Sequence, residues 1–146
     1  MPRKVIFLDI DGVMNSLAGK AGQRGLSSWL DPVHVALLND VVRATGAVVV
    51  VSSSWRRSMP LDALRLAFAE AGCVAEVVDV TPDLDPGRRG REIAAWLAAQ
   101  REPPTRYAIL DDTFDMPELP GKLVKTSRVE GLTAREVPRL LALLAD

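Results

Sequence analysis

Two aspartates lie directly after a short apolar segment near the start of the chain. Residues 5–8 (VIFL) are consecutive apolar residues, a pattern typical of a strand buried on both faces of a parallel α/β sheet. Asp9 follows this segment, Asp11 comes two residues later, and Gly12 allows a tight turn. Ligands of open α/β sheets bind at the carboxyl ends of the strands. Two carboxylates so close together repel each other unless a cation lies between them, and Mg²⁺, which prefers oxygen ligands, is the natural candidate. A simple acidic turn is the alternative.

Polar side chains also follow two later apolar segments. Residues 47–51 (AVVVV) precede three serines at 52–54, and residues 106–110 (RYAIL) precede Asp111 and Asp112. The carboxyl ends of parallel strands meet at one edge of a sheet, so these side chains are expected to lie together with Asp9. Acids, a hydroxyl and arginines in the adjoining loops predict a metal site that handles phosphate.

The elements that must position these residues alternate between helix and strand. Helices are predicted from Pro32 to Gly46, from Leu61 to Gly72, around residues 93–97, and after a capping box formed by Thr133 and Glu136. Weaker strands are predicted at residues 74–80 and 122–126. This order favours a three-layer α/β/α fold with a parallel sheet.

Composition excludes several classes of protein. The chain has 146 residues, and we expect one domain over residues 1–146. The net charge of −1 gives no overall field that attracts nucleic acid or an anionic membrane, so any basic site must be local. One cysteine excludes an internal disulfide and a cysteine-based zinc cluster. No apolar run approaches the roughly 18 residues of a membrane span, and a cytoplasmic protein is expected. From the sequence, no protein partner is predictable.

The sequence resembles the haloacid dehalogenase (HAD) superfamily, and in particular the HAD domain of multidomain RNA-repair proteins. The matching segments run in family order over nearly the whole chain: residues 7–15 (FLDIDGVMN), 51–56 (VSSSWR), 89–97 (RGREIAAWL), 109–112 (ILDD) and 131–133 (GLT). The resemblance implies a Rossmann-like HAD fold and an enzyme that hydrolyses phosphoesters with Mg²⁺.

The resemblance also implies roles for the residues of the first two motifs. Asp9 would be the nucleophile that forms an aspartyl-phosphate, which water then releases. Asp11 would protonate the leaving oxygen and later activate that water, and its backbone carbonyl would bind the metal. Ser52 would hydrogen-bond a phosphate oxygen, whereas Ser53 takes this role if the register shifts by one residue.

The acidic motif that follows the third apolar segment implies the rest of the metal site. Asp111 and Asp112 would complete the Mg²⁺ site with Asp9, with Asp112 as the direct ligand and Asp111 in support. Asp115 also fits the family spacing, so which two acids bind the metal stays open.

The chain departs from the family at the third motif, which usually carries a lysine. No lysine lies between Lys20 and Lys122. Arg89, at the start of a predicted helix, is our candidate for the missing cation, although an arginine is not equivalent to a lysine. Lys125 is a less favoured substitute.

The expected substrate follows from the space around the site. Members of the superfamily that act on small substrates often carry an inserted cap domain, but here residues 13–30 suffice only for a flap. An open site suits a phosphate on a large molecule, such as a nucleotide or a nucleic-acid end. Six basic residues are expected near its rim, with Arg56 as a substrate-binding candidate: Lys20, Arg24, Arg56, Arg57, Arg88 and Arg89. Trp29 and Trp55 would either stack on a base or cover the core.

Three other functions stay open at this point. The first is a non-catalytic phosphate-binding or nucleic-acid-binding module that keeps the HAD fold. The second is a small-molecule phosphatase, and the third is a phosphotransferase that passes the phosphoryl group to an acceptor other than water.

Overall fold

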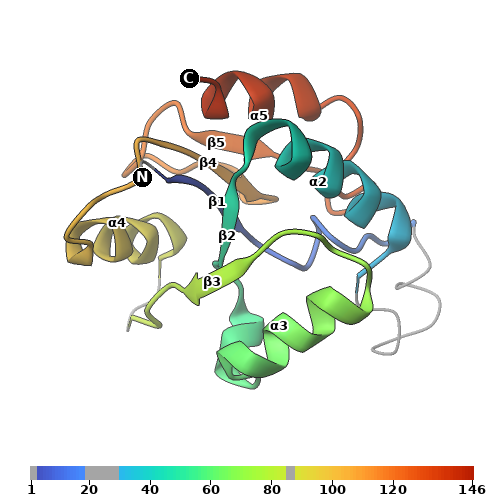
Figure 1. Cartoon of the computed structure of the whole chain (residues 1–146), viewed down its shortest axis with the longest axis horizontal. Helices are drawn as coiled ribbons and strands as arrows, with labels where there is room; N and C mark the ends of the chain where they lie inside the picture. Colours follow the sequence, from blue (N-terminus) through green and yellow to red (C-terminus); the bar gives the residue numbers. More distant parts are fainter. Residues whose placement is uncertain (1–2, 19–29, 85–87) are drawn as a thin grey trace.

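A five-stranded parallel sheet forms the centre of the molecule (Figure 1). The computed structural model describes residues 3–18, 30–84 and 88–146. The strand order is β3-β2-β1-β4-β5, so β1 lies in the middle. The strands are β1 (Lys4–Leu8), β2 (Val48–Val51), β3 (Val77–Val80), β4 (Arg106–Asp111) and β5 (Leu123–Lys125). The predicted parallel α/β architecture is confirmed.

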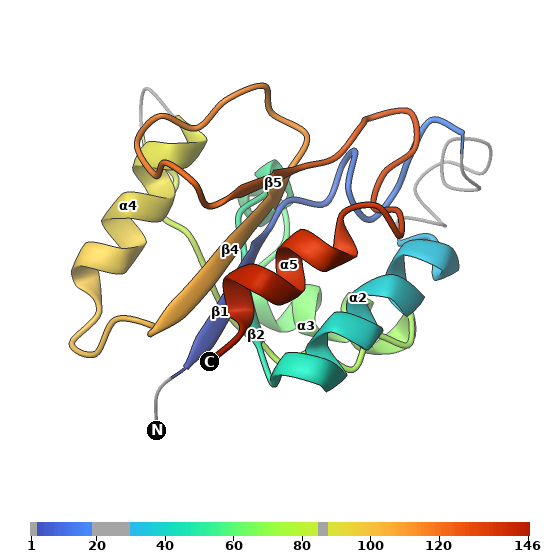
Figure 2. The ribbon, with the colours of Figure 1, turned by 90° about the horizontal axis from the view of Figure 1, so that it is seen from above.

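Helices cover both faces of the sheet and give the predicted three layers (Figure 2). Ile6 and Leu8 of β1 pack in one core with α2, α3 and α5, whereas Val5 and Phe7 pack in a second core with α4. All four side chains are fully buried, which explains why β1 is apolar at every one of these positions. The helices are α2 (Pro32–Thr45), α3 (Leu61–Glu70), α4 (Arg89–Ala99) and α5 (Val137–Leu144), with a short 3₁₀ helix η2 (Ser54–Arg57) after β2.

Two element boundaries differ from the sequence expectation. The strand predicted from residue 74 begins only at Val77, because the Asn39 side chain holds the preceding turn through the Gly72 carbonyl at 3.0 Å and the Val74 amide at 2.8 Å. The capping box does form, since the Thr133 amide donates to Glu136 Oε1 at 2.8 Å. It closes a turn ahead of α5, however, so Pro138 falls at the start of that helix, where a missing N–H costs little.

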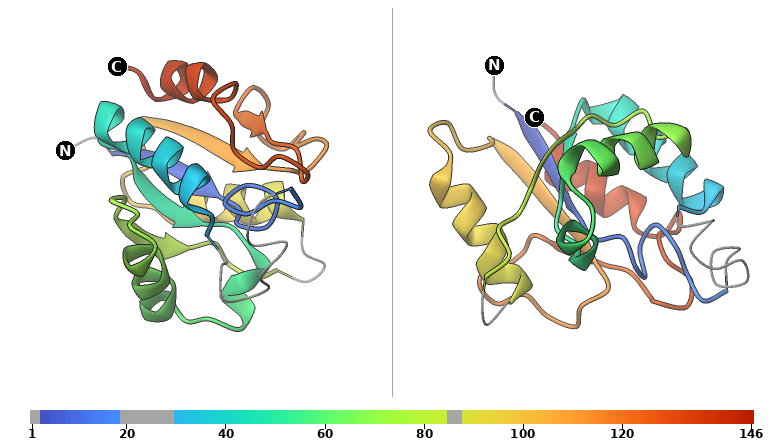
Figure 3. Two further views of the ribbon diagram at one scale, coloured as in Figure 1. Left: turned by 90° about the vertical axis from the view of Figure 1, so that its right-hand side faces the viewer. Right: turned by 90° about the horizontal axis from the view of Figure 1, so that it is seen from below.

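The strands run in one direction and place their carboxyl ends at one edge (Figure 3). Among the described residues, α2, α3 and α5 pack on one face of the sheet and α4 on the other. Residues 19–29, most of the expected flap, lie outside the described part of the chain. None of the described helices has the length and apolar character needed to cross a membrane.

Candidate active site

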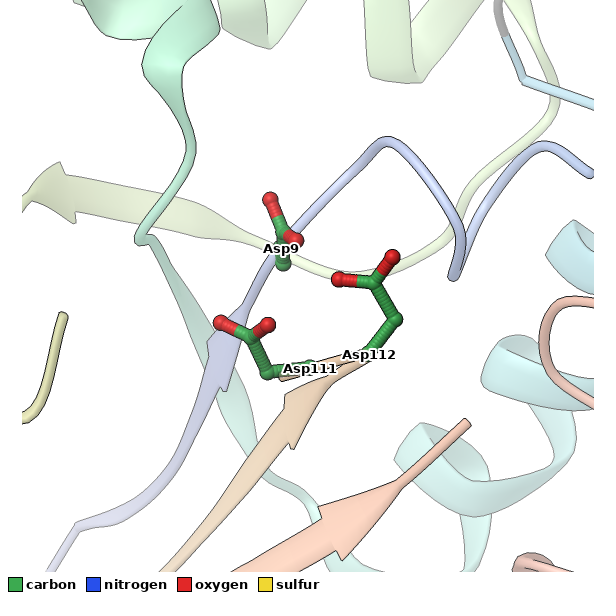
Figure 4. Close-up of side chains that lie close together, drawn as sticks. All are labelled: Asp9, Asp111 and Asp112. Carbon is green, nitrogen blue, oxygen red and sulfur yellow. The ribbon is translucent and has the colours of Figure 1, made fainter. Parts of the chain in front are cut away.

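The sheet brings the acids of two separate sequence segments together. Asp9 follows β1 and Asp111 ends β4, and these strands are neighbours with Leu8 paired to Leu110. The Asp9 amide continues this pairing by donating to the Leu110 carbonyl at 2.9 Å. Asp9, Asp111 and Asp112 each direct a carboxylate oxygen to a common point, all within 4.8 Å of one another (Figure 4). We call these three residues the carboxylate cluster.

The carboxylate cluster is buried and strongly repulsive. Asp9 is 6% exposed and Asp111 is 3% exposed. Burial, together with the nearby Asp111 carboxylate, raises the pKa of Asp9 from its ordinary 3.8 to about 8. Burial likewise raises the pKa of Asp111 to about 6, although the guanidinium of Arg89 opposes the rise. The Arg89 Nε lies 3.5 Å from Asp111 Oδ2 and the Arg128 Nε lies 3.3 Å from Asp112 Oδ2, so two arginines face three carboxylates.

The donor set fits a small divalent cation. Asp9 Oδ1 accepts the Ile10 amide at 2.9 Å, and Asp111 Oδ1 accepts the Thr113 amide at 2.9 Å. These bonds orient both carboxylates, while the buried Asp111 Oδ2 has no hydrogen-bond partner among the described residues. Mg²⁺ prefers oxygen ligands, and the converging carboxylates offer them, including a buried oxygen of Asp111 without a hydrogen bond.

Gly12 lets the loop after β1 approach Asp112 closely. Its φ of 81° lies in the left-handed region, and a Cβ on this residue would collide with the Asp112 carboxylate. The Thr126 hydroxyl, just beyond β5, donates to the Gly12 carbonyl at 2.6 Å and fixes the loop. Thr126 was missed by the sequence reasoning, since nothing local signals a bond to a residue so distant in the chain.

Asp11 does not join the carboxylate cluster with its side chain. It is exposed and accepts hydrogen bonds from Trp55 Nε1 and Asn15 Nδ2 instead. Asp115 also lies outside the cluster, and its Oδ1 accepts the Met116 amide at 2.8 Å. Of the two alternatives left open by the sequence, the geometry therefore favours Asp111 and Asp112 over Asp115.

The serines after β2 have three different environments. The Ser52 amide donates to the Leu8 carbonyl at 2.8 Å, which places Ser52 beside Asp9. Its side chain is 1% exposed, and its hydroxyl has no partner among the residues described. Ser53 Oγ instead accepts the Trp55 amide and caps η2. Ser54 lines a polar pocket together with Asp9. A phosphate-binding role thus suits Ser52 better than Ser53.

Two arginines connect the end of β2 to α4, in different ways. Arg89 donates through its Nη1 to the Ser52 carbonyl, and its Nε lies 3.5 Å from Asp111 Oδ2. Arg56 lines the same pocket as Asp9, but not as the exposed rim residue that we expected. Its side chain is 4% exposed, and it donates to Glu92 Oε2 and to the Ser53 carbonyl, each at 2.7 Å.

The carboxylate cluster opens into a polar pocket of about 530 Å³. Arg57 and Arg128 lie on it with side chains 57% and 72% exposed, and Arg128 Nε is 3.3 Å from Asp112 Oδ2. Arg128 and Glu92 were missed by the sequence reasoning. Of the other basic residues expected near the rim, Arg88 pairs with Glu118, and Lys20 and Arg24 lie outside the described residues. Trp29 also lies outside them. The pocket is lined by Asp9, Asp11, Ser54, Arg56, Arg57, Arg89, Glu92, Asp111, Asp112, Thr113 and Arg128.

The fold and the carboxylate cluster together define a HAD-type α/β protein. Residues 5–137 match the family described as the HAD domain in Swiss Army Knife RNA repair proteins, and the chain belongs to this family. Comparison with curated proteins and with solved structures gave no match. The family supports a phosphatase-like fold, and the resemblance read from the sequence is confirmed.

The geometry predicts that Asp112, and not Asp115, contributes to metal binding. Replacing Asp112 by Asn removes one oxygen from the cluster, whereas Asp115→Asn changes a carboxylate in the same loop outside it. We expect Asp112→Asn to weaken Mg²⁺ binding at least tenfold in a calorimetric titration and Asp115→Asn to leave it within about twofold. Equal losses in the two variants would contradict the assignment.

The raised pKa of Asp9 predicts a pH-dependent stability in metal-free protein. Between pH 3.8 and about 8 the folded state alone keeps this proton, so the free energy of unfolding falls as the pH rises. Asp9→Asn removes the titration. In EDTA we therefore expect the variant to have a higher Tm than the wild type at pH 8, with a smaller difference at pH 5. Thermal unfolding followed by circular dichroism measures this, and a Tm difference independent of pH would count against the buried, repelling carboxylate.

Proposed function

We propose that this chain is a Mg²⁺-dependent phosphomonoesterase that works through an aspartyl-phosphate on Asp9. The observation that carries the proposal is the buried carboxylate cluster at the ends of β1 and β4, open to a pocket with arginines on it. A bound Mg²⁺, held by Asp9, Asp111 and Asp112, would neutralise the approach of an anionic nucleophile to an anionic phosphate.

The chain's own residues account for the two chemical steps. In the first, an Asp9 carboxylate oxygen bonds to phosphorus while the bond from phosphorus to the leaving oxygen breaks, and Asp11 gives that oxygen a proton. In the second, water bonds to phosphorus, Asp11 takes its proton, and the bond between phosphorus and Asp9 breaks. Inorganic phosphate leaves, and both aspartates return to their starting states.

Ser52 and Arg89 are suited to hold the phosphate during these steps. The Ser52 hydroxyl is a buried donor without another partner in the described structure. Arg89 stands at the first position of α4, where the backbone amides of the helix also favour an anion. It bridges the carbonyl of Ser52 and the carboxylate of Asp111, and so joins the two strand ends between which a phosphate would lie.

Substitution of the two aspartates of the first motif tests the proposed chemistry. We expect Asp9→Asn to reduce release of phosphate from p-nitrophenyl phosphate to background, because it removes the nucleophile at nearly constant volume. Asp11→Asn is expected to lower the turnover of an alkyl phosphate by about 10²–10⁴-fold. Asp115→Asn is the matched control, since its carboxylate lies outside the cluster.

Each result separates the proposed enzyme from its alternatives. Wild-type turnover by Asp9→Asn would exclude the aspartyl-phosphate. Binding of phosphate without any turnover by the wild type would favour the non-catalytic module. Phosphate transfer to added alcohols in place of water would identify a phosphotransferase.

We further propose that the phosphate belongs to a nucleotide or a nucleic-acid end. The family description names RNA repair proteins, and the pocket adjoins a surface suited to a nucleic-acid strand. A second hollow shares Asp112 and Arg128 with the catalytic pocket and includes Lys125. The Lys125 Nζ lies 5.0 Å from the centre of the Phe114 ring, and Phe114 is 87% exposed. An exposed aromatic ring beside cations is a suitable platform for a base.

Removal of two cations from this rim tests the proposed substrate. Arg57→Ala combined with Lys125→Ala should raise the KM for a 5′- or 3′-phosphorylated oligonucleotide at least tenfold at low salt, and change that for p-nitrophenyl phosphate less than threefold. The slope of log KM against log salt should fall by roughly 0.7 for each backbone phosphate that the variant no longer neutralises. Arg43→Ala is the control. Arg43 lies in the last turn of α2, which leads into the start of β2, and the start of this strand is at the edge of the sheet opposite the site. Equal effects on both substrates would favour a small-molecule phosphatase.

A further inference from the structure

The carboxylate of Asp11 is held from two sides. Trp55 Nε1 lies 3.2 Å from both carboxylate oxygens, and Asn15 Nδ2 donates to Oδ1 at 3.0 Å. Asn15 also accepts the Gly12 amide through its own Oδ1 at 3.1 Å. The asparagine therefore closes the loop after β1, and Trp55 links this loop to the segment after β2.

Trp55 is a well-anchored donor. Its ring is half-buried and packs against the core that contains α2, α3 and α5. Its own amide donates to the Ser53 hydroxyl at the start of η2. These contacts hold the indole relative to β2. From there its N–H donates to Asp11, which lies in the loop after the neighbouring strand β1. Ser53, which the sequence offered as a second phosphate-binding residue, accepts the Trp55 amide and so helps to hold Trp55 in place.

The position of Asp11 matters because this fourth carboxylate lines the same pocket as the three carboxylates of the cluster. Asp11 lines the pocket but lies outside the carboxylate cluster. A carboxylate without partners would be drawn toward a divalent cation in that cluster. Hydrogen bonds from an indole and an amide satisfy its oxygens elsewhere, and leave the group at the pocket, where a leaving oxygen or a water would arrive.

We propose that Trp55 is a positioning residue that keeps the Asp11 carboxyl available for proton transfer and away from the metal ligands. This inference rests on the proposed phosphatase function and adds a residue to it. The proton moves between Asp11 and the leaving oxygen. The Trp55 indole keeps its own proton throughout this step. The Trp55 side chain acts through Asp11 and does not touch the phosphate.

A comparison of two substrates tests this role. Trp55→Phe keeps a large aromatic ring but removes the N–H. An alkyl phosphate needs a proton on its leaving oxygen, whereas p-nitrophenolate leaves readily without one. We expect Trp55→Phe to lower kcat at least tenfold for glycerol 2-phosphate and less than threefold for p-nitrophenyl phosphate. In an Asp11→Asn background the same substitution should have no further effect on kcat.

Trp96→Phe is the matched control. Trp96 Nε1 also donates to a carboxylate, that of Asp79, at 2.8 Å, but from α4 to β3 in the other core. Its loss should leave the ratio of the two kcat values unchanged. Nitrogen-15 NMR of the indole groups gives a measurement that does not need turnover: Asp11→Asn should shift the Trp55 Nε1–H resonance and speed its hydrogen exchange, and leave that of Trp96 unchanged.

The outcomes separate the failure of this inference from that of the proposed function. Equal losses of kcat on both substrates in Trp55→Phe, or no loss on either, would overturn the positioning role. So would a Trp55 indole resonance that does not respond to Asp11→Asn. Absence of phosphate release by the wild type from both substrates and from a phosphorylated oligonucleotide would overturn the phosphatase function itself, and with it the catalytic role of the hydrogen bond between Trp55 and Asp11.

Discussion

Three carboxylates lie close together at the ends of two neighbouring strands. Their mutual repulsion is opposed by hydrogen bonds and by arginine side chains from the surrounding loops and from α4. The parallel pairing of β1 and β4 forces Asp9 and Asp111 side by side. Burial makes the charged forms costly, which is why the pKa of Asp9 rises to about 8. A fold that keeps such a cluster at the ends of its central strands loses stability at that place unless a cation joins it, and such a loss is typical of a functional site.

The loops around the carboxylate cluster limit this cost without removing it. Backbone amides of Ile10 and Thr113 each satisfy one carboxylate oxygen. Arg89 supplies a single positive charge from α4. The remaining repulsion is what a divalent cation would relieve. The Asp11 side chain is kept apart by its own pair of donors, so that one short sequence motif provides two carboxylates in different environments.

The sequence sufficed for the features that depend on local pattern and on the geometry of parallel sheets. Apolar runs located the strands, and residues at their carboxyl ends had to meet, which is why Asp9, Asp111 and Asp112 were found together. What it did not reveal are pairings between distant side chains. The Trp55 contact with Asp11 and the Thr126 contact with Gly12 depend on the relative placement of loops. No periodicity or spacing encodes them. The same holds for Arg56, whose partner Glu92 lies on α4, well beyond any local motif.

The Arg56–Glu92 pair shows how the side of the pocket that carries Arg89 gains its shape. Both side chains are almost fully buried, and Glu92 Oε2 also accepts the Leu84 amide at 3.0 Å. The pair ties the segment after β2 to α4, the helix that carries Arg89. Loss of one partner would leave a buried charge uncompensated, at a cost of about 3–5 kcal/mol. The distance between Ser52 and Arg89 therefore depends on a buried ion pair that itself need not touch the substrate. An effect of Arg56 on activity would accordingly reflect the shape of the pocket, whereas an effect of the exposed Arg57 or Arg128 would reflect contacts with the proposed substrate.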